Sequence, residues 1–126
     1  MDTIQRLASV PSREAILTKA TTRAAARLGL SGRFLADVLG VSEAQVSRFK
    51  NGEATLAQNT KSFELAALLV RVFRSLDAIV GGDDRVACTW LKSENTALGA
   101  QPLERMTSIQ GLMDVVTYLD TRRAPI

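Results

Sequence analysis

The stretch of sequence that decides the fold is LADVLGVSEAQVSRFK, residues 35–50. Two short helices that cross near a right angle need a small residue at the crossing, and Ala36 is small. The turn between such helices needs a positive φ, which Gly40 adopts without steric cost. Val41 is expected to plug this turn into the core, while the inner faces of the two helices are expected to be anchored by Leu35, Leu39, Val46 and Phe49. The spacing predicts a helix-turn-helix, and the alternative is an ordinary helical hairpin.

The outer face of the second of these helices is expected to contact DNA. The amide of Gln45 suits adenine edges in a major groove, and the guanidinium of Arg48 suits guanine edges. A helix N-terminus and flanking polar or basic residues suit phosphates. Glu43, at the same helix tip, meets phosphates unfavourably unless it accepts from a cytosine amine or turns aside. The predicted DNA-binding residues are Arg33, Ser42, Ala44, Gln45, Ser47, Arg48, Lys50 and Asn51.

Helical periodicity continues on both sides of the motif. Upstream, a helix is expected between the N-cap Ser12 and Gly29. Its inner face is predicted to comprise Ile16, Leu17, Ala20, Ala24 and Leu28. Downstream, residues 60–80 form the longest periodic segment, which is apolar nearly all the way round and must therefore be buried on several sides. We expect it to be the central strut and part of a dimer interface.

The Gly-Gly-Asp-Asp stretch at residues 81–84 breaks this periodicity and marks a boundary between two halves. Beyond it, one helix is expected around Trp90, Pro102 opens a short helical turn, and Ser108 caps a last helix. The inner face of that helix is predicted to comprise Ile109, Leu112, Val116 and Leu119. No segment has the pattern of a strand, so the predicted fold class is all-α.

The expected domain organisation follows from these elements. Residues 1–11 form an N-terminal arm, and residues 12–80 form a helix-turn-helix bundle that includes the long central helix. Residues 81–126 form a small C-terminal helical domain.

The composition excludes several classes of function. The 126 residues include one cysteine and no histidine, so an internal disulfide, a cysteine-built zinc site and histidine-dependent catalysis are all impossible. Of the carboxylate pairs, Asp83 with Asp84 has the pattern of a helix cap, and Asp114 with Asp120 lies off one helix face. We therefore expect no enzyme activity, no metal and no cofactor.

Charge is divided unevenly along the chain. Residues 1–75 hold 11 Lys/Arg against 6 Asp/Glu, whereas residues 76–126 hold 5 against 7. A basic half joined to a mildly acidic half predicts that the two halves meet different partners, the alternative being a random split of solvated charge. No run approaches the roughly 18 apolar residues of a membrane span, and the N-terminus lacks the apolar core of a signal peptide. A cytoplasmic location without membrane contact is expected.

The C-terminal half carries a second pattern, in which Asn95 is a local cap, Gly99 a turn residue and Pro102 a helix start. Gly111 inside the last helix costs about 1 kcal/mol against alanine, which suggests that the backbone there closely approaches another part of the protein. Taken singly, the apolar members of the pattern are typical of a small core. The full set is Trp90, Leu91, Asn95, Leu98, Gly99, Pro102, Leu103, Thr107, Gly111, Val115, Val116 and Leu119.

Both patterns have counterparts in known families. Residues 35–49 resemble the Xre-type helix-turn-helix of phage-repressor-like regulators, and the C-terminal pattern is similar to the toxin-binding domain of Xre/MbcA/ParS antitoxins. The two resemblances occur in the family's order and together cover roughly residues 12–121.

This resemblance implies a dimeric antitoxin that binds operator DNA with its toxin and represses their shared promoter. It also implies that the C-terminal region obstructs the active-site entrance of a RES-domain toxin, an enzyme that degrades NAD. The toxin-binding residues that follow from it are Trp90, Asn95, Leu98, Pro102, Leu103, Arg122, Arg123 and Ile126. The tail after Asp120 departs from the family pattern, so its two arginines either engage the toxin's pocket or form a solvated end. A stand-alone dimeric repressor without a toxin partner is the alternative function.

Overall fold

The computed structural model describes residues 10–123, and this part of the chain is all-α as predicted. Residues 1–9 of the expected N-terminal arm and residues 124–126, including Ile126, lie outside the described residues. The helices are α2 (Arg13–Arg27), α3 (Gly32–Leu39), α4 (Glu43–Asn51), α5 (Lys61–Ile79), α6 (Asp84–Lys92), α7 (Pro102–Arg105) and α8 (Ile109–Arg123).

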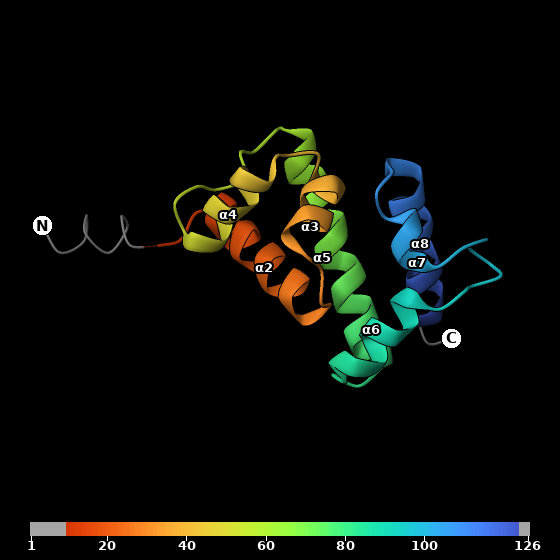
Figure 1. The fold of residues 1–126 in the computed structure, drawn as a ribbon. Helices are drawn as coiled ribbons and strands as arrows, with labels where there is room; N and C mark the ends of the chain where they lie inside the picture. Colours follow the sequence, from red (N-terminus) through yellow and green to blue (C-terminus); the bar gives the residue numbers. More distant parts are fainter. Residues whose placement is uncertain (1–9, 124–126) are drawn as a thin grey trace, which may run out of the picture.

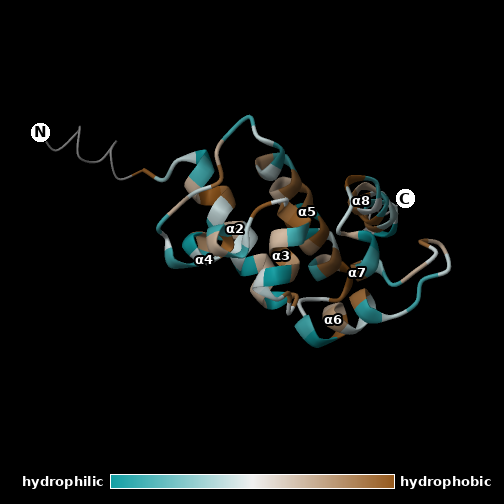
Figure 2. Ribbon diagram, turned by 45° about the horizontal axis from the view of Figure 1, so that its top comes forward, coloured by the Kyte–Doolittle hydropathy of each residue, from teal (hydrophilic) through white to brown (hydrophobic). Residues whose placement is uncertain are grey.

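Helix α5 is the central strut, with the helix-turn-helix on one side and the C-terminal helices on the other (Figure 1). It packs most extensively against α8 and next against α2, while α3 and α6 make smaller contacts with it. Figure 2 shows hydrophobic positions concentrated along α5, between the two groups of helices. Buried residues from both halves form one continuous cluster that includes Leu35, Leu69, Leu91 and Leu112. The two halves therefore share a core through α5.

The helix starts predicted from the sequence are confirmed by side-chain caps. The hydroxyl oxygens of Ser12, Ser31 and Ser42 each accept a hydrogen bond from the backbone N–H three residues later, at 3.0, 3.0 and 3.1 Å. Thr60 caps α5 in the same way. Each bond satisfies one of the N–H groups that a helix leaves without a partner in its first turn.

The inner face of α2 differs from the prediction. Ile16 was expected inside but is 57% exposed, whereas Thr18 and Thr21 are buried. The threonines are tolerated in the core because their hydroxyls are hydrogen-bonded: Thr18 donates to the Glu14 carbonyl and accepts from the Leu56 N–H. The buried face of α2 is thus rotated away from Ile16.

A second difference occurs at the start of α8. Ile109 was expected to face inward but is 61% exposed, while Leu112, Val116 and Leu119 are buried as predicted. Ile109 is the first residue of α8, and burial along this helix begins at Gly111 and Leu112.

Two further observations complete the fold. Within residues 10–123 the only strand-like pairing is an isolated bridge between Asn95 and Ala100. No helix in the described range combines the length and the apolarity needed to cross a membrane.

Candidate DNA-binding and partner-binding surfaces

The turn between α3 and α4 has the geometry that the sequence predicts. Gly40 adopts φ 70°, ψ 35°, and its N–H and that of Val41 both donate to the Ala36 carbonyl. Ala36 is 4% exposed, and Leu35 and Val46 are almost completely buried beside it. The small side chain at position 36 lets the two helices pack closely, so the outer face of α4 is fixed relative to the body.

That outer face is open to solvent. Of the predicted DNA-binding residues, seven are exposed and Gln45 is half-buried; the exposed ones are Arg33, Ser42, Ala44, Ser47, Arg48, Lys50 and Asn51. Ser42 uses its oxygen as the N-cap of α4, which leaves its hydroxyl hydrogen available to an acceptor outside the protein. Glu43 is exposed at the same helix tip. The face therefore offers donors and two cations, Arg48 and Lys50, along α4, with Arg33 on α3 as a further cation.

The side chain of Lys50 extends from α4 to the start of α3, a position that sequence spacing did not predict. Its ammonium lies 3.5 Å from the position that a Cβ on Gly32 would occupy, over the first turn of α3. Arg33 is the second residue of that turn. An ammonium group beside the positive end of a helix dipole is unfavourable unless an anion joins them. The arrangement is chemically suited to a phosphate.

In the C-terminal half, three side chains from two helices form a stack. The rings of Trp90 on α6 and Tyr118 on α8 are stacked with centroids 6.0 Å apart and planes inclined by 22°. The guanidinium of Arg122 lies over the Tyr118 ring, 4.9 Å from its centroid. Arg122 is exposed, and both rings are half-buried. The stack orders an exposed cation on the last turn of α8.

Tyr118 is a residue that the sequence prediction missed. Its spacing of four residues from Arg122 places both on one helix face, and this signal was present in the sequence. Its stacking on Trp90 brings together positions 28 residues apart and depends on how α6 and α8 pack.

The other predicted toxin-binding residues have roles in the fold. Asn95 accepts a hydrogen bond from the Leu98 N–H through its side chain, and Gly99 has φ 73°, which together close the turn before α7. Pro102 is the first residue of α7 and is buried, so little of its side chain is accessible in the described structure. Leu98 and Leu103 are half-buried against the core. The side chain of Arg123, another predicted toxin-binding residue, lies outside the described part of the structure.

An ion-pair cluster that the sequence prediction missed joins the two halves. Arg27 at the end of α2 bonds to Asp77 on α5 and Asp84 on α6, each at 2.9 Å, and lies over the Phe73 ring. The hydrogen bond to Asp84, helped by the negative charge of both carboxylates, raises the pKa of Arg27 above its ordinary value. Cys88 adds a hydrogen bond from its Sγ to the Arg27 carbonyl. Arg27 therefore remains charged and ties α2 to α5 and α6.

These features define a class of protein: a helix-turn-helix regulator with a second, helical module packed on the shared central helix. Comparison with protein families makes the class specific. The antitoxin Xre-like helix-turn-helix domain matches residues 8–71, and the antitoxin Xre/MbcA/ParS C-terminal toxin-binding domain matches residues 75–124. The chain belongs to the Xre/MbcA/ParS-type antitoxin family.

Membership of this family sets the coarse function. The chain is a regulator and not an enzyme, with DNA and a toxin protein as its two kinds of partner. A comparison with curated proteins finds no match.

Proposed function

We propose that this chain acts as a homodimer that binds operator DNA through α4 to repress its own operon, and that its C-terminal domain neutralises a RES-like, NAD-degrading toxin by covering the active-site entrance. DNA and a toxin of this kind would both be met in the cytoplasm. The observation that carries the proposal is the placement of two unlike surfaces on opposite sides of α5: the exposed α4 face and the Trp90–Tyr118–Arg122 stack.

The DNA-binding role is supported by the chemistry of α4. Arg48 is exposed and has no ion-pair partner within residues 10–123, so its guanidinium is available for a bidentate contact to guanine. Lys50 and Arg33, with the first turn of α3, supply the phosphate contacts that fix the register of the motif on the duplex.

The neutralising role is supported by the ordering of Arg122. Tryptophan, tyrosine and arginine are the residue types that most often dominate protein–protein binding energies. Here all three are joined in one stack within the matched toxin-binding domain. An arginine held in place by Tyr118 loses less conformational entropy on binding than a free one.

The DNA-binding role is tested by measuring the affinity of the wild-type chain and of Arg48→Ala for the promoter fragment upstream of its own coding sequence. The variant should lose about 1–3 kcal/mol of binding free energy and discriminate less between operator variants. Lys61→Ala, which removes an exposed cation at the start of α5, is the matched control and should bind as the wild type does. Equal losses in both variants would contradict readout by α4.

The neutralising role is tested by co-expressing the chain with the protein encoded by the adjacent reading frame. The neighbour should deplete NAD and stop growth when expressed alone, and the wild-type chain and Arg48→Ala should both restore growth. Arg122→Glu should lose protection, whereas Arg85→Glu, an exposed control on α6, should keep it. A neighbour that is harmless alone would favour the stand-alone repressor instead.

A further inference from the structure

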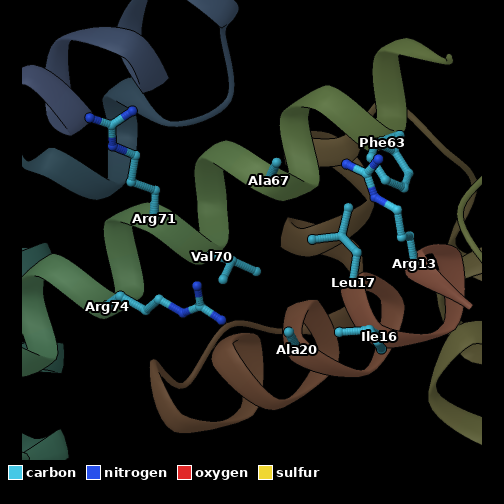
Figure 3. Close-up of a pocket in the computed structure, with 9 residues that line it drawn as sticks. All are labelled: Arg13, Ile16, Leu17, Ala20, Phe63, Ala67, Val70, Arg71 and Arg74. Carbon is cyan, nitrogen blue, oxygen red and sulfur yellow. The ribbon is translucent and has the colours of Figure 1, made fainter. Parts of the chain in front are cut away.

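A groove between α2 and α5 is open on the surface of the protein (Figure 3). It encloses about 490 Å³, within the range of about 300–1,000 Å³ that is usual for ligand sites. Its apolar lining includes Ile16 and Leu17 from α2 and Phe63 and Val70 from α5. Ile16 is 57% exposed, although isoleucine is among the residues most often buried. The groove therefore presents apolar surface that nothing within residues 10–123 covers.

The rim of this groove is cationic. Arg13 reaches from α2 towards α5 at one end of the groove, and Arg74 reaches from α5 towards α2 at the other end (Figure 3). Both arginines are exposed, and neither has an ion-pair partner within residues 10–123. The third arginine of the lining, Arg71, is paired with Asp120 on α8. Because the lining contains no acidic residue, Arg13 and Arg74 are available to the carboxylates of a bound partner.

A second hollow extends this surface along α2. It shares Ile16 and Ala20 with the groove and adds Lys19 and Arg23, and its lining also contains no acidic residue. Both added cations are exposed and have no ion-pair partner in the described part of the chain. The exposed side of α2 therefore carries an apolar ridge at Ile16, with cations in the hollow on each side of it.

This pattern limits the chemistry of the occupant. Two copies of the chain that met face to face here would bring two sets of arginines together across a desolvated contact, which costs binding energy. A nucleic acid would satisfy the arginines but would leave Ile16 and Phe63 against charged phosphates. The fitting partner combines an apolar stripe with carboxylates on both sides of it.

The shape of the groove favours a helix as the occupant. Its lining on α5 runs from Phe63 to Arg74, which spans about 16 Å along the helix, or about three turns. Both walls are helices whose backbone groups are bonded internally, so an extended segment would find no backbone partners there. An amphipathic helix satisfies its own backbone, lays its apolar face on the floor of a groove and carries charged residues to the two rims.

We infer that the α2–α5 groove binds an acidic amphipathic helix of a partner protein that is neither the toxin nor a second copy of this chain. The lining lies within residues 13–74, outside the matched toxin-binding domain at residues 75–124, and it includes no residue of α4. The groove is therefore separate from the two surfaces that the proposed function uses, and the inference goes beyond that function.

A synthetic peptide tests this chemistry. The probe is a helix of about 18 residues whose leucines recur at intervals of three and four on one face, with glutamates on both sides of them. Fluorescence anisotropy measures its affinity for the full-length chain. Ile16→Ser and Arg74→Glu should each weaken binding by about ten-fold or more, as should a peptide of the same composition with its leucines spread around the helix. A probe that does not bind, or that binds no better than the second peptide, would overturn the inference.

Matched variants in the other half of the protein control for general loss of charge and apolar surface. Ile109→Ser replaces a similarly exposed isoleucine and Arg85→Glu an exposed arginine, and both should bind the probe as the wild type does. Circular dichroism should show that all variants are folded. Arg48→Ala should also bind normally, since only a peptide that occupied the DNA-binding face would depend on Arg48. A probe that is weakened by Arg48→Ala and not by Arg74→Glu would overturn the inference.

Two further measurements on Ile16→Ser separate the partner from a second copy and from the toxin. Light scattering should give the same oligomeric state as for the wild type, and co-expression with the adjacent reading frame should show the same protection of growth. A changed oligomeric state would make a second copy the occupant of the groove, and lost protection would make the toxin the occupant. Either result would overturn the inference.

Discussion

At the scale of single residues, the hydroxyl of Thr18 joins α2 to the segment that follows α4. It accepts a hydrogen bond from the Leu56 N–H at 2.8 Å and donates to the Glu14 carbonyl at 2.7 Å, and the residue is 4% exposed. Thr18→Val keeps the shape of the side chain but leaves a buried N–H without a partner. We expect the free energy of unfolding to fall by about 1–3 kcal/mol, measured by urea denaturation.

The control for this change is Thr22→Val on the same helix. The Thr22 hydroxyl donates to the Lys19 carbonyl at 3.1 Å in an exposed place and accepts no bond across the core. Its loss should change stability by no more than about 0.5 kcal/mol. Similar losses in the two variants would mean that the bond to Leu56 contributes nothing.

A second prediction at this scale concerns Gly111 in the first turn of α8. A Cβ built on Gly111 would lie 1.8 Å from the Arg105 carbonyl oxygen, so α7 and α8 can approach only because position 111 has no side chain. Gly111→Ala should therefore destabilise the protein by about 3 kcal/mol or more despite its better helix propensity.

Gly40→Ala provides the comparison for Gly111. Gly40 has a positive φ, but nothing lies within 4 Å of its missing Cβ. The cost of alanine there is the left-handed backbone alone, about 1–2 kcal/mol. Thermal or urea unfolding that ranks Gly40→Ala as the more damaging change would contradict the close contact between α7 and α8.

Single-residue features that act locally could be predicted from the sequence. The caps at Ser12, Ser31 and Ser42 and the turn at Gly40 depend on neighbours three or four residues away, which the sequence displays directly. The polar burial of Thr18 could not be predicted, because its partner Leu56 is 38 residues distant.

At the scale of elements, helix positions were predictable but helix faces were less so. The apolar residues of α2 are compatible with more than one inner face, and the sequence favours the one that contains Ile16. The observed face is rotated because α2 must pack on α5 while Thr18 reaches Leu56. The buried face of a helix depends on its tertiary contacts, which the spacing of apolar residues in the sequence does not specify.

The two helices of the motif allow a prediction about their starts. Ser31 and Ser42 each provide one N-cap bond, to the Phe34 and Gln45 N–H groups. Ser31→Ala and Ser42→Ala should each lower the free energy of unfolding by about 1 kcal/mol, and the double variant by about 2, since the two bonds are independent. Ser108→Ala, which removes the bond to the Gly111 N–H, should behave alike. Urea denaturation measures the stability of these four variants. Midpoints equal to that of the wild type would show that the N-cap bonds contribute nothing to stability.

At the scale of the whole molecule, the exposed face of α4 was largely predictable from the sequence, and the side-chain clusters that join distant helices were not. The α4 face is set by one contiguous motif of 16 residues, 35–50. The stack of Trp90, Tyr118 and Arg122, the Arg27 cluster and the α2–α5 groove instead require knowledge of how distant helices pack. Pro102, which the family resemblance placed in the partner-binding set, is buried in the described structure.

The shared core also predicts how the molecule unfolds. Leu35 on α3, Leu69 on α5 and Leu91 on α6 belong to one cluster, so the two halves share a single core. Leu35→Ala should remove about 2–5 kcal/mol of stability. Because the halves are coupled, the loss should appear equally in the C-terminal half, which the single tryptophan, Trp90, reports by its fluorescence. Urea curves followed by that fluorescence and by far-UV circular dichroism should shift together. If the Trp90 fluorescence midpoint stays unchanged while the dichroism midpoint moves, the two halves unfold separately. The packing of both halves on α5 would then not couple their stabilities.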